Sequence, residues 1–228
     1  MSASFQLCTI DDLPCVVRGP ETGPRVLLIQ PLFEEMNRSR RLMAQITGRL
    51  AAAGVRSWMP DLPGTGDALG EMNWADWQHK ILSFHTNIKS HHAEIVRVIA
   101  IRGGSLLVNE FPERYVLAPV MTGAVIIRDL LRTRAMANPD LPTERVERLA
   151  ARLKSEPLDL AGYPISPAMA SALERAITDT AGAHVANIGD GGFAGPPVWR
   201  QSEPADASLL ADNIADDIKT WIASCASH

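Results

Sequence analysis

The side chains best suited to chemistry lie where the apolar run 97–101 meets a glycine pair, Gly103 and Gly104. A strand-to-helix turn that presents a catalytic side chain needs a small residue two positions before it and a glycine two positions after it, because the turn leaves no room for a Cβ. Ala100 and Gly104 meet this requirement around Arg102. Arginine is always protonated and cannot act as a general base, but its planar fork binds carboxylate or phosphate. The junction therefore predicts either an anion-binding group or a structural cation at the turn.

A second register of the same junction makes Ser105 the nucleophile. It places Leu107 where a small residue is required and moves the serine into the first turn of the following helix. We favour Arg102 at the turn, and Ser105 stays open as the alternative.

A serine nucleophile needs an acid and then a histidine further along the chain. Asp190 follows the apolar segment 183–188, where the acid belongs. The loop 203–206, where the histidine belongs, contains Glu203 and no histidine. The histidines lie elsewhere and are interpreted as surface, edge or core residues: His79, His85, His91, His92, His184 and His228. A standard triad cannot be assembled.

Two adjacent carboxylates, Glu34 and Glu35, follow the first buried run and could face Arg102. Removing one partner of such a buried ion pair typically costs about 3–5 kcal/mol. A buried glutamate with a raised pKa could also act as a general base. Alternatively, these acids and Asn37 only cap the helix that begins here. Both interpretations stay open.

Short apolar runs alternate with segments of helical periodicity along the chain. Strands are predicted at 25–30, 55–60, 97–101, 115–120, 183–188 and 198–202, and helices at 38–53, 74–90 and 208–223, with a further helix beginning at Ser105. This alternation predicts a mostly parallel central sheet with helices on both faces. Together with the turn at Arg102 it predicts the α/β-hydrolase fold.

The segment 123–171 breaks this rhythm, because it is rich in arginine, helical by pattern and interrupted by five prolines. We interpret it as a small helical cap inserted over the carboxyl edge of the sheet. The whole chain, 1–228, is then expected to form a single domain.

Composition narrows the function classes. The formal charge of -4 and the scattered basic residues argue against nucleic-acid binding. No apolar run approaches the roughly 18 residues of a membrane span, and no signal segment is apparent at the N-terminus. The three cysteines lack metal-like spacing and are expected to be free thiols in the cytoplasm. No cofactor motif is found, so neither a cofactor nor a metal is expected.

Several motifs together resemble the exosortase A system-associated hydrolases of the second type, a family grouped with the α/β hydrolases. The matching segments cover Pro31–Arg41, Asp61–Asp67, Ile101–Gly104 and Leu158–Pro167. The resemblance implies an arginine at the turn, an ester, thioester or acyl substrate, and a bacterial setting of exopolysaccharide production and exosortase-dependent protein sorting. Ala100 and Ser105 depart from this pattern, where glycine and alanine are expected.

Two functions follow from these observations. The first is a hydrolase or acyltransferase that uses Ser105, or a hydrolase whose water is activated by Glu34 or Glu35, with Asp190 as a further catalytic candidate. The second is a non-catalytic protein that binds an anionic acyl or saccharide ligand, or a partner from the exopolysaccharide and exosortase system. The residues expected to bind the ligand are Arg102, Glu34, Asn37, Gly103, Gly104 and Glu203. A homodimer is compatible with either function.

Overall fold

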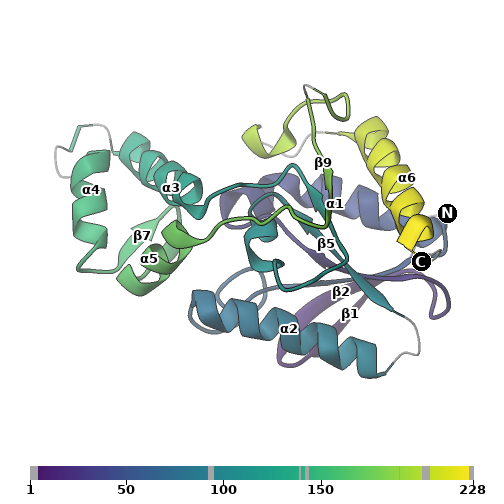
Figure 1. Cartoon of the computed structure of the whole chain (residues 1–228). Coiled ribbons are helices and arrows are strands. Elements are labelled where there is room, and N and C mark those ends of the chain that lie inside the picture. Colours follow the sequence, from purple (N-terminus) through teal and green to yellow (C-terminus); the bar gives the residue numbers. More distant parts are fainter. Residues whose placement is uncertain are drawn as a thin grey trace.

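The computed structural model describes residues 5–91, 95–138, 140–141, 144–189, 191–201 and 206–225. A seven-stranded sheet, in the order β1-β2-β4-β3-β5-β6-β9, forms its centre (Figure 1). The strands are β1 (Phe5–Ile10), β2 (Leu13–Arg18), β3 (Arg25–Ile29), β4 (Arg56–Pro60), β5 (Val96–Ile101), β6 (Arg114–Leu117) and β9 (Ala183–Ala186). Strands β4, β3, β5, β6 and β9 pair in parallel, whereas β1 and β2 pair antiparallel. The predicted mostly parallel sheet is confirmed.

Helices cover both faces of this sheet, as predicted. Helices α1 (Glu34–Ala52) and α6 (Ser208–Cys225) lie on one face, and α2 (Trp74–Ser90) lies on the other (Figure 1). The alternation of side chains along β3 supplies both cores, because Val26 and Leu28 pack with α1 and α6, whereas Leu27 and Ile29 pack with α2. Strands β3, β5 and β6 are buried along their whole length, which explains their largely apolar sequences.

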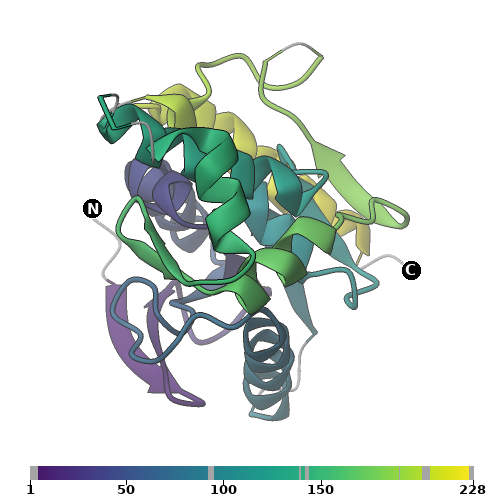
Figure 2. The ribbon, with the colours of Figure 1, turned by 90° about the vertical axis from the view of Figure 1, so that its left-hand side faces the viewer.

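A smaller lobe projects from the sheet between β6 and β9. It consists of α3 (Gly123–Ala137), α4 (Val146–Leu153), a hairpin of β7 (Leu158–Leu160) and β8 (Tyr163–Ile165), and α5 (Pro167–Arg175). Figure 2 shows these elements in front of the central sheet. The proposed cap, 123–171, corresponds to this lobe without the last residues of α5.

The two chain crossings into the lobe lie side by side. Thr122 and Ile177 form an antiparallel bridge, and the N–H of Gly123 donates to the carbonyl of Ala176 at 2.9 Å. A Cβ on Gly123 would lie 1.9 Å from the carbonyl oxygen of Leu173, so α3 and α5 approach as closely as only glycine allows. We refer to residues 121–123 and 176–178 as the neck.

Two of the predicted elements were wrong. The segment 198–202 is no strand where it is described, because Val198–Arg200 form a 3-10 helix, η3. Pro196 and Pro197 precede it and lack the N–H groups that would pair with β9. The helix expected from Ser105 is a 3-10 helix over Arg102–Leu107, η1, after which the chain turns at Val108.

Helix α1 also begins at Glu34, four residues before the predicted start at Arg38. The two acids in its first turn explain this boundary, because carboxylates are favourable near the positive end of the helix dipole. Glu34 and Glu35 therefore belong to the first turn of α1 and not, as was predicted, to the loop after β3.

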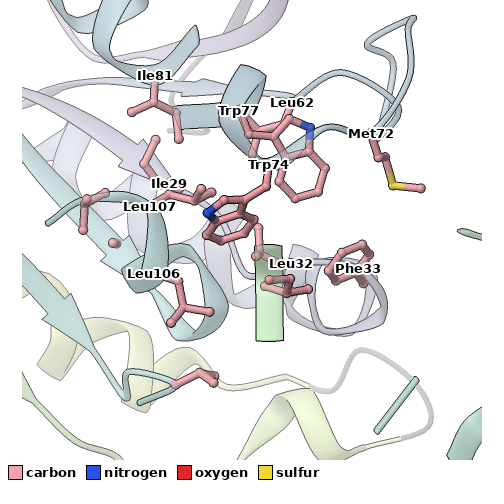
Figure 3. Close-up of a cluster of buried hydrophobic side chains, with 14 of the residues drawn as sticks. Ile29, Leu32, Phe33, Leu62, Met72, Trp74, Trp77, Ile81, Leu106 and Leu107 are labelled. Atoms are coloured by element: carbon pink, nitrogen blue, oxygen red, sulfur yellow. The ribbon is translucent and has the colours of Figure 1, made fainter. Parts of the chain in front are cut away.

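The larger of the two cores joins α2 to the sheet and to the start of α1 (Figure 3). Asn73 caps α2 by accepting a hydrogen bond from the N–H of Asp76 at 3.0 Å. Trp77 is fully buried, and its indole Nε1 donates to the carbonyl of Pro63 at 2.9 Å. Its ring lies 5.8 Å from the ring of Phe33, the residue that precedes α1. This core thus fixes the entry to the helix that carries Glu34 and Glu35.

We expect Ile81→Ala to lower the free energy of unfolding by about 2–5 kcal/mol, because Ile81 is fully buried and its loss leaves a cavity. The neighbouring Leu82, which is 39% exposed, provides the control, and Leu82→Ala should cost about 0.5 kcal/mol or less. Urea unfolding followed by circular dichroism measures both. Equal losses in the two variants would contradict the position of α2 against the sheet.

Candidate functional site

Arg102 occupies the sharp turn between β5 and η1. Its backbone has a φ of 53°, which is unusual for a residue other than glycine, whereas the preceding Ile101 is extended. A Cβ on Gly104 would lie 2.5 Å from the carbonyl oxygen of Gln30, at the end of β3. The glycine two positions after Arg102 is therefore required by the close approach of the turn to the neighbouring strand. The geometry places Arg102, and not Ser105, at the turn.

The guanidinium of Arg102 is held on three sides. Its Nε donates to Oε2 of Glu35 at 3.1 Å and its Nη2 donates to Oε1 of the same carboxylate at 2.7 Å. Its Nη1 donates to the carbonyl of Ala118, just after β6, at 3.0 Å. The guanidinium carbon lies 4.4 Å from the ring centroid of Trp199 in η3, which is a cation–π distance. The side chains of Arg102 and Glu35 are only 17% and 25% exposed, so the pair is largely shielded from water.

Glu35 faces Arg102, as the first interpretation of the acidic pair predicted, and no described side chain caps the start of α1. It lies in the first turn of α1, where the helix dipole favours an acid, and it pairs with Arg102. Phe33 enters the helix with a φ of 55° and a ψ of -133°, which turns the chain sharply at the end of the loop after β3. The strained entry brings the first turn of α1 next to the turn at Arg102.

Asn37 connects α1 to the lobe. Its Nδ2 donates to the hydroxyl oxygen of Tyr163 in β8 at 3.3 Å, and the ring of Tyr163 meets Phe33 edge to face at 5.2 Å. Burial, and then the negative charge of Glu34, raise the pKa of Tyr163. The tyrosine therefore stays neutral, and this contact positions the lobe above the carboxyl edge of the sheet.

Ser105 lies away from the Arg102 pair and is completely buried. Its Oγ is 2.7 Å from the hydroxyl of Thr178, which in turn donates to the carbonyl of Val120 at 2.6 Å. Thr178 belongs to the neck, so this hydrogen-bonded pair ties η1 to the base of the lobe. The described surroundings of Ser105 contain no base that could activate it.

Among the residues that the structure describes, no histidine lines the cavity beside Arg102. His184 pairs with Asp217 at 3.1 Å near the amino end of β9, whereas Arg102 follows the carboxyl end of β5. The ring Nε2 of His85 lies 2.8 Å from the carbonyl of Val96, and burial lowers its pKa, so the neutral ring fits this contact. The candidates Asp190 and Glu203, like His92 and His228, lie outside the described residues.

A cavity of about 510 Å³ opens beside the Arg102–Glu35 pair, between the start of α1, helix α3 and η3. Among the described residues that line it are five arginines and three carboxylates: Arg38, Arg102, Arg128, Arg132 and Arg200, with Glu34, Glu35 and Asp129. The apolar residues of the lining come mostly from the same elements and include Leu32, Val120, Val125, Ile126, Leu130 and Met136. The volume suits a small ligand, and the lining carries an excess of positive charge.

Most of these charges are paired within the cavity wall. Arg128 and Arg132 lie 3.7 and 3.8 Å from the same carboxylate, that of Asp129. Arg38 lies 3.9 Å from Glu34 and also donates to the carbonyl of Trp199 at 3.4 Å. One carboxylate thus balances two cations on α3, which leaves a positive surface there.

Sequence reasoning missed Trp199 and the arginines other than Arg102. The arginine-rich pattern of 123–171 was the one available signal, because Arg128 and Arg132 are one helical turn apart on α3 and face the same cavity. Nothing in the local sequence indicated that Trp199 would reach Arg102 from a segment 97 residues away.

In the part of the chain that the structure describes, no group of three or more His, Cys, Asp or Glu side chains could hold a metal ion. Within the same residues, no helix has both the length and the apolar character that crossing a bilayer requires.

Comparison with solved structures identifies the architecture. Est1E from Butyrivibrio proteoclasticus, solved with bound ferulic acid, matches with a TM-score of 0.59 at 14% identity, over 96% of this chain and 99% of that one. An AqdC variant, solved in complex with its substrate in a study of ring cleavage of the Pseudomonas quinolone signal, matches with a TM-score of 0.53 at 13% identity, over 97% and 100%. The hypothetical protein PA2218 from Pseudomonas aeruginosa matches with a TM-score of 0.54 at 11% identity, over 82% and 77%.

No family model matches the chain, and no curated protein matches it either. The resemblance to exosortase-associated hydrolases therefore gains no support from the comparisons. The similarity in fold is clear over nearly the whole chain: the protein has the α/β-hydrolase fold.

The Arg102–Glu35 pair should contribute more to stability than an exposed pair. In a double-mutant cycle with Arg102→Gln and Glu35→Gln, we expect a coupling of about 1–3 kcal/mol, because the pair is bidentate and mostly shielded from water. The free energies of unfolding of the four proteins, measured in urea, give this value.

The adjacent pair Arg38 and Glu34 provides a matched control. It lies on the same helix turn but at 3.9 Å, with both side chains 34% exposed, so a coupling of about 0.3–0.5 kcal/mol is expected. A coupling for Arg102 and Glu35 no larger than that of the control would contradict the structural role given to the pair.

Proposed function

We propose that this chain is an α/β-hydrolase-fold protein that binds an anionic small molecule beside Arg102 and does not carry out serine hydrolysis. The observation that carries the proposal is the side chain at the turn. Where a serine hydrolase presents its nucleophile, this chain presents an arginine whose charge is already engaged by Glu35. The fold is kept while the position for nucleophilic attack is occupied by a structural ion pair.

The charge of the cavity supports an anionic ligand. Two of its arginines, Arg128 and Arg132, share one carboxylate, and Arg200 is exposed on the opposite wall without an ion-pair partner among the described residues. Guanidinium groups bind phosphate and carboxylate through paired hydrogen bonds. Because Arg128 and Arg132 share the single carboxylate of Asp129, an anionic ligand can accept hydrogen bonds from their remaining N–H groups. Arg102 itself orders the floor of the cavity and is not required as the direct ligand.

The apolar residues that line the cavity support a ligand with an apolar part. Leu32, Val125 and Ile126 line the cavity on the side of η1 and α3, and Met136 is 80% exposed at its rim. An acyl chain could cover this surface while its anionic head contacts the arginines. In this proposal, the lobe that contributes α3 is the cap over the ligand.

The expected setting of the protein remains part of the proposal. An anionic acyl or saccharide ligand would suit the positive charge of the cavity. Its origin in exopolysaccharide production or exosortase-dependent sorting rests on the resemblance in sequence alone. A cytoplasmic location and a homodimer likewise stay predictions.

A second candidate is a hydrolase in which a glutamate activates water. It is favoured by one observation: Glu34 and Glu35 both line the cavity, and the side chain of Glu34 is 34% exposed there. Glu35 would first have to release Arg102, because both of its oxygens accept hydrogen bonds from that side chain. Glu34 is therefore the better candidate base for this alternative.

We expect the purified protein not to react with a fluorophosphonate probe and not to hydrolyse short-chain p-nitrophenyl esters. The reason is that Ser105 is fully buried and paired with Thr178. Intact mass and absorbance at the p-nitrophenolate band measure the two reactions, with Ser105→Ala and Glu34→Gln in parallel. Labelling that disappears in Ser105→Ala would overturn the proposal, and turnover lost only in Glu34→Gln would establish the second candidate.

We expect octyl phosphate or octanoate to bind, and the neutral octyl glucoside to bind at least tenfold more weakly, because the arginines contact only an anionic head. Replacing both Arg128 and Arg132 by glutamine should weaken the anion by about tenfold or more, which corresponds to about 1.4 kcal/mol. Isothermal titration calorimetry at low and moderate salt measures the affinities. Glucuronate tests a saccharide anion in the same way.

The control for the two substitutions is Arg148→Gln, because Arg148 is exposed on α4 and does not line the cavity. It should leave the affinities unchanged. Equal binding of octyl glucoside and octyl phosphate, or an equal loss in Arg148→Gln, would remove the basis for an anion site on α3.

A further inference from the structure

The hairpin at the edge of the sheet places two cysteines opposite each other. Strands β1 and β2 are joined by Asp11 and Asp12, whose φ angles of 50° and 64° form the two-residue turn that suits the twist of a hairpin. This turn sets the register, in which Cys8 is the direct partner of Cys15. Both cysteines are free thiols.

The hydrogen-bonding pattern of the hairpin defines the distance between them. The carbonyl of Pro14 accepts a hydrogen bond from the N–H of Asp61 at 2.9 Å, so it points away from β1, and a proline has no N–H to offer β1. Pro14 and Thr9 are therefore a non-hydrogen-bonded pair, and the next pair, Cys8 and Cys15, is hydrogen-bonded. Such a pair has its Cα atoms about 5.5 Å apart, within the range of about 4.4–6.8 Å that a disulfide spans.

The two thiols differ in their access to solvent. Cys15 is 3% exposed and packs in the core with α2, whereas Cys8 is half-buried on the edge strand. Burial, and then the neighbouring Cys8, raise the pKa of the Cys15 thiol. A small oxidant from solution therefore reaches Cys8 first, and Cys15 lies next to the product.

We propose that Cys8 and Cys15 are a reversible oxidation site for a hydroperoxide. The thiolate of Cys8 attacks the peroxide, the O–O bond breaks, and Cys8 becomes a sulfenic acid while the peroxide leaves as water or an alcohol. The thiol of Cys15 then attacks the sulfur of the sulfenic acid, the S–S bond forms, and the hydroxyl leaves with the thiol proton as a second water. The two cysteines lose two electrons, which reduce the peroxide.

The position of the pair makes the modification reversible. The Cβ atoms of a hydrogen-bonded cross-strand pair lie farther apart than the about 3.5–4.5 Å of a disulfide, so the strands must draw together. β1 can make this movement, because it is the edge strand and its outer residues Phe5 and Leu7 are exposed. A bond closed under strain is readily reduced by another thiol, so the site can return to its dithiol form.

The test uses the folded full-length chain with Cys225→Ser, which retains the pair and removes the third thiol. After treatment with hydrogen peroxide, its intact mass should fall by two hydrogens, and dithiothreitol should restore it. The tryptic peptide that ends at Arg18 contains both cysteines and should carry this loss. Cys8→Ser in the same background is the matched control, because Cys8 is half-buried on an edge strand and its replacement by serine should not disturb the core.

In the Cys8→Ser control, the buried Cys15 should remain a thiol at peroxide concentrations that close the pair. Circular dichroism and size-exclusion chromatography verify that the oxidised protein is folded and has the elution volume of the reduced protein. The proposal is overturned if the pair gains oxygen without losing two hydrogens, if it does not react, or if the disulfide forms between chains. Each of these outcomes is independent of ligand binding in the Arg102 cavity.

Discussion

The guanidinium of Arg102 is the contact on which the carboxyl edge of this structure depends. Four segments that are distant in sequence meet there: the turn after β5, the start of α1 at Glu35, the carbonyl of Ala118 and the ring of Trp199. Both oxygens of Glu35 accept hydrogen bonds from the guanidinium, so the contact fixes the first turn of α1 against the turn after β5. A position that the fold offers for covalent chemistry is here used to join the floor of a cavity.

The sequence was sufficient to predict the elements that are buried on both sides or have a strong helical period. Strand β3 and helix α2 were predicted to within one residue, because a continuous apolar run fits a doubly covered strand and Trp77, Ile81, Phe84 and Ile88 follow a single helix face. The turn at Arg102 was also predictable, since the steric demand for Gly104 is local. Glu35 was one of two candidate partners for Arg102. The sequence does not show which of the adjacent residues Glu34 and Glu35 faces the turn.

The remaining features depend on contacts that no local pattern contains. The segment around Trp199 has the composition of a strand, yet the preceding prolines exclude it from the sheet and its ring packs on Arg102. Ser105 has a glycine two positions before it, as the turn of a nucleophile requires, but its hydroxyl is paired with that of Thr178 in the neck. Predicting the cationic surface of α3 required knowing that Arg128 and Arg132, although 52% and 59% exposed, line the same cavity as the start of α1. In each case the partner comes from another part of the fold.

The neck affects how the sequence of this protein can evolve. The chain enters the lobe at Gly123 and leaves it at Ala176, and these two residues are joined by a hydrogen bond of 2.9 Å. A segment whose two ends already touch can be shortened, lengthened or exchanged without separating the strands on either side. The lobe supplies α3, and with it a cationic wall of the cavity, while the sheet supplies the floor. Under the proposed function, ligand preference can thus evolve by replacing one exchangeable segment, with the Arg102 junction left intact beneath it.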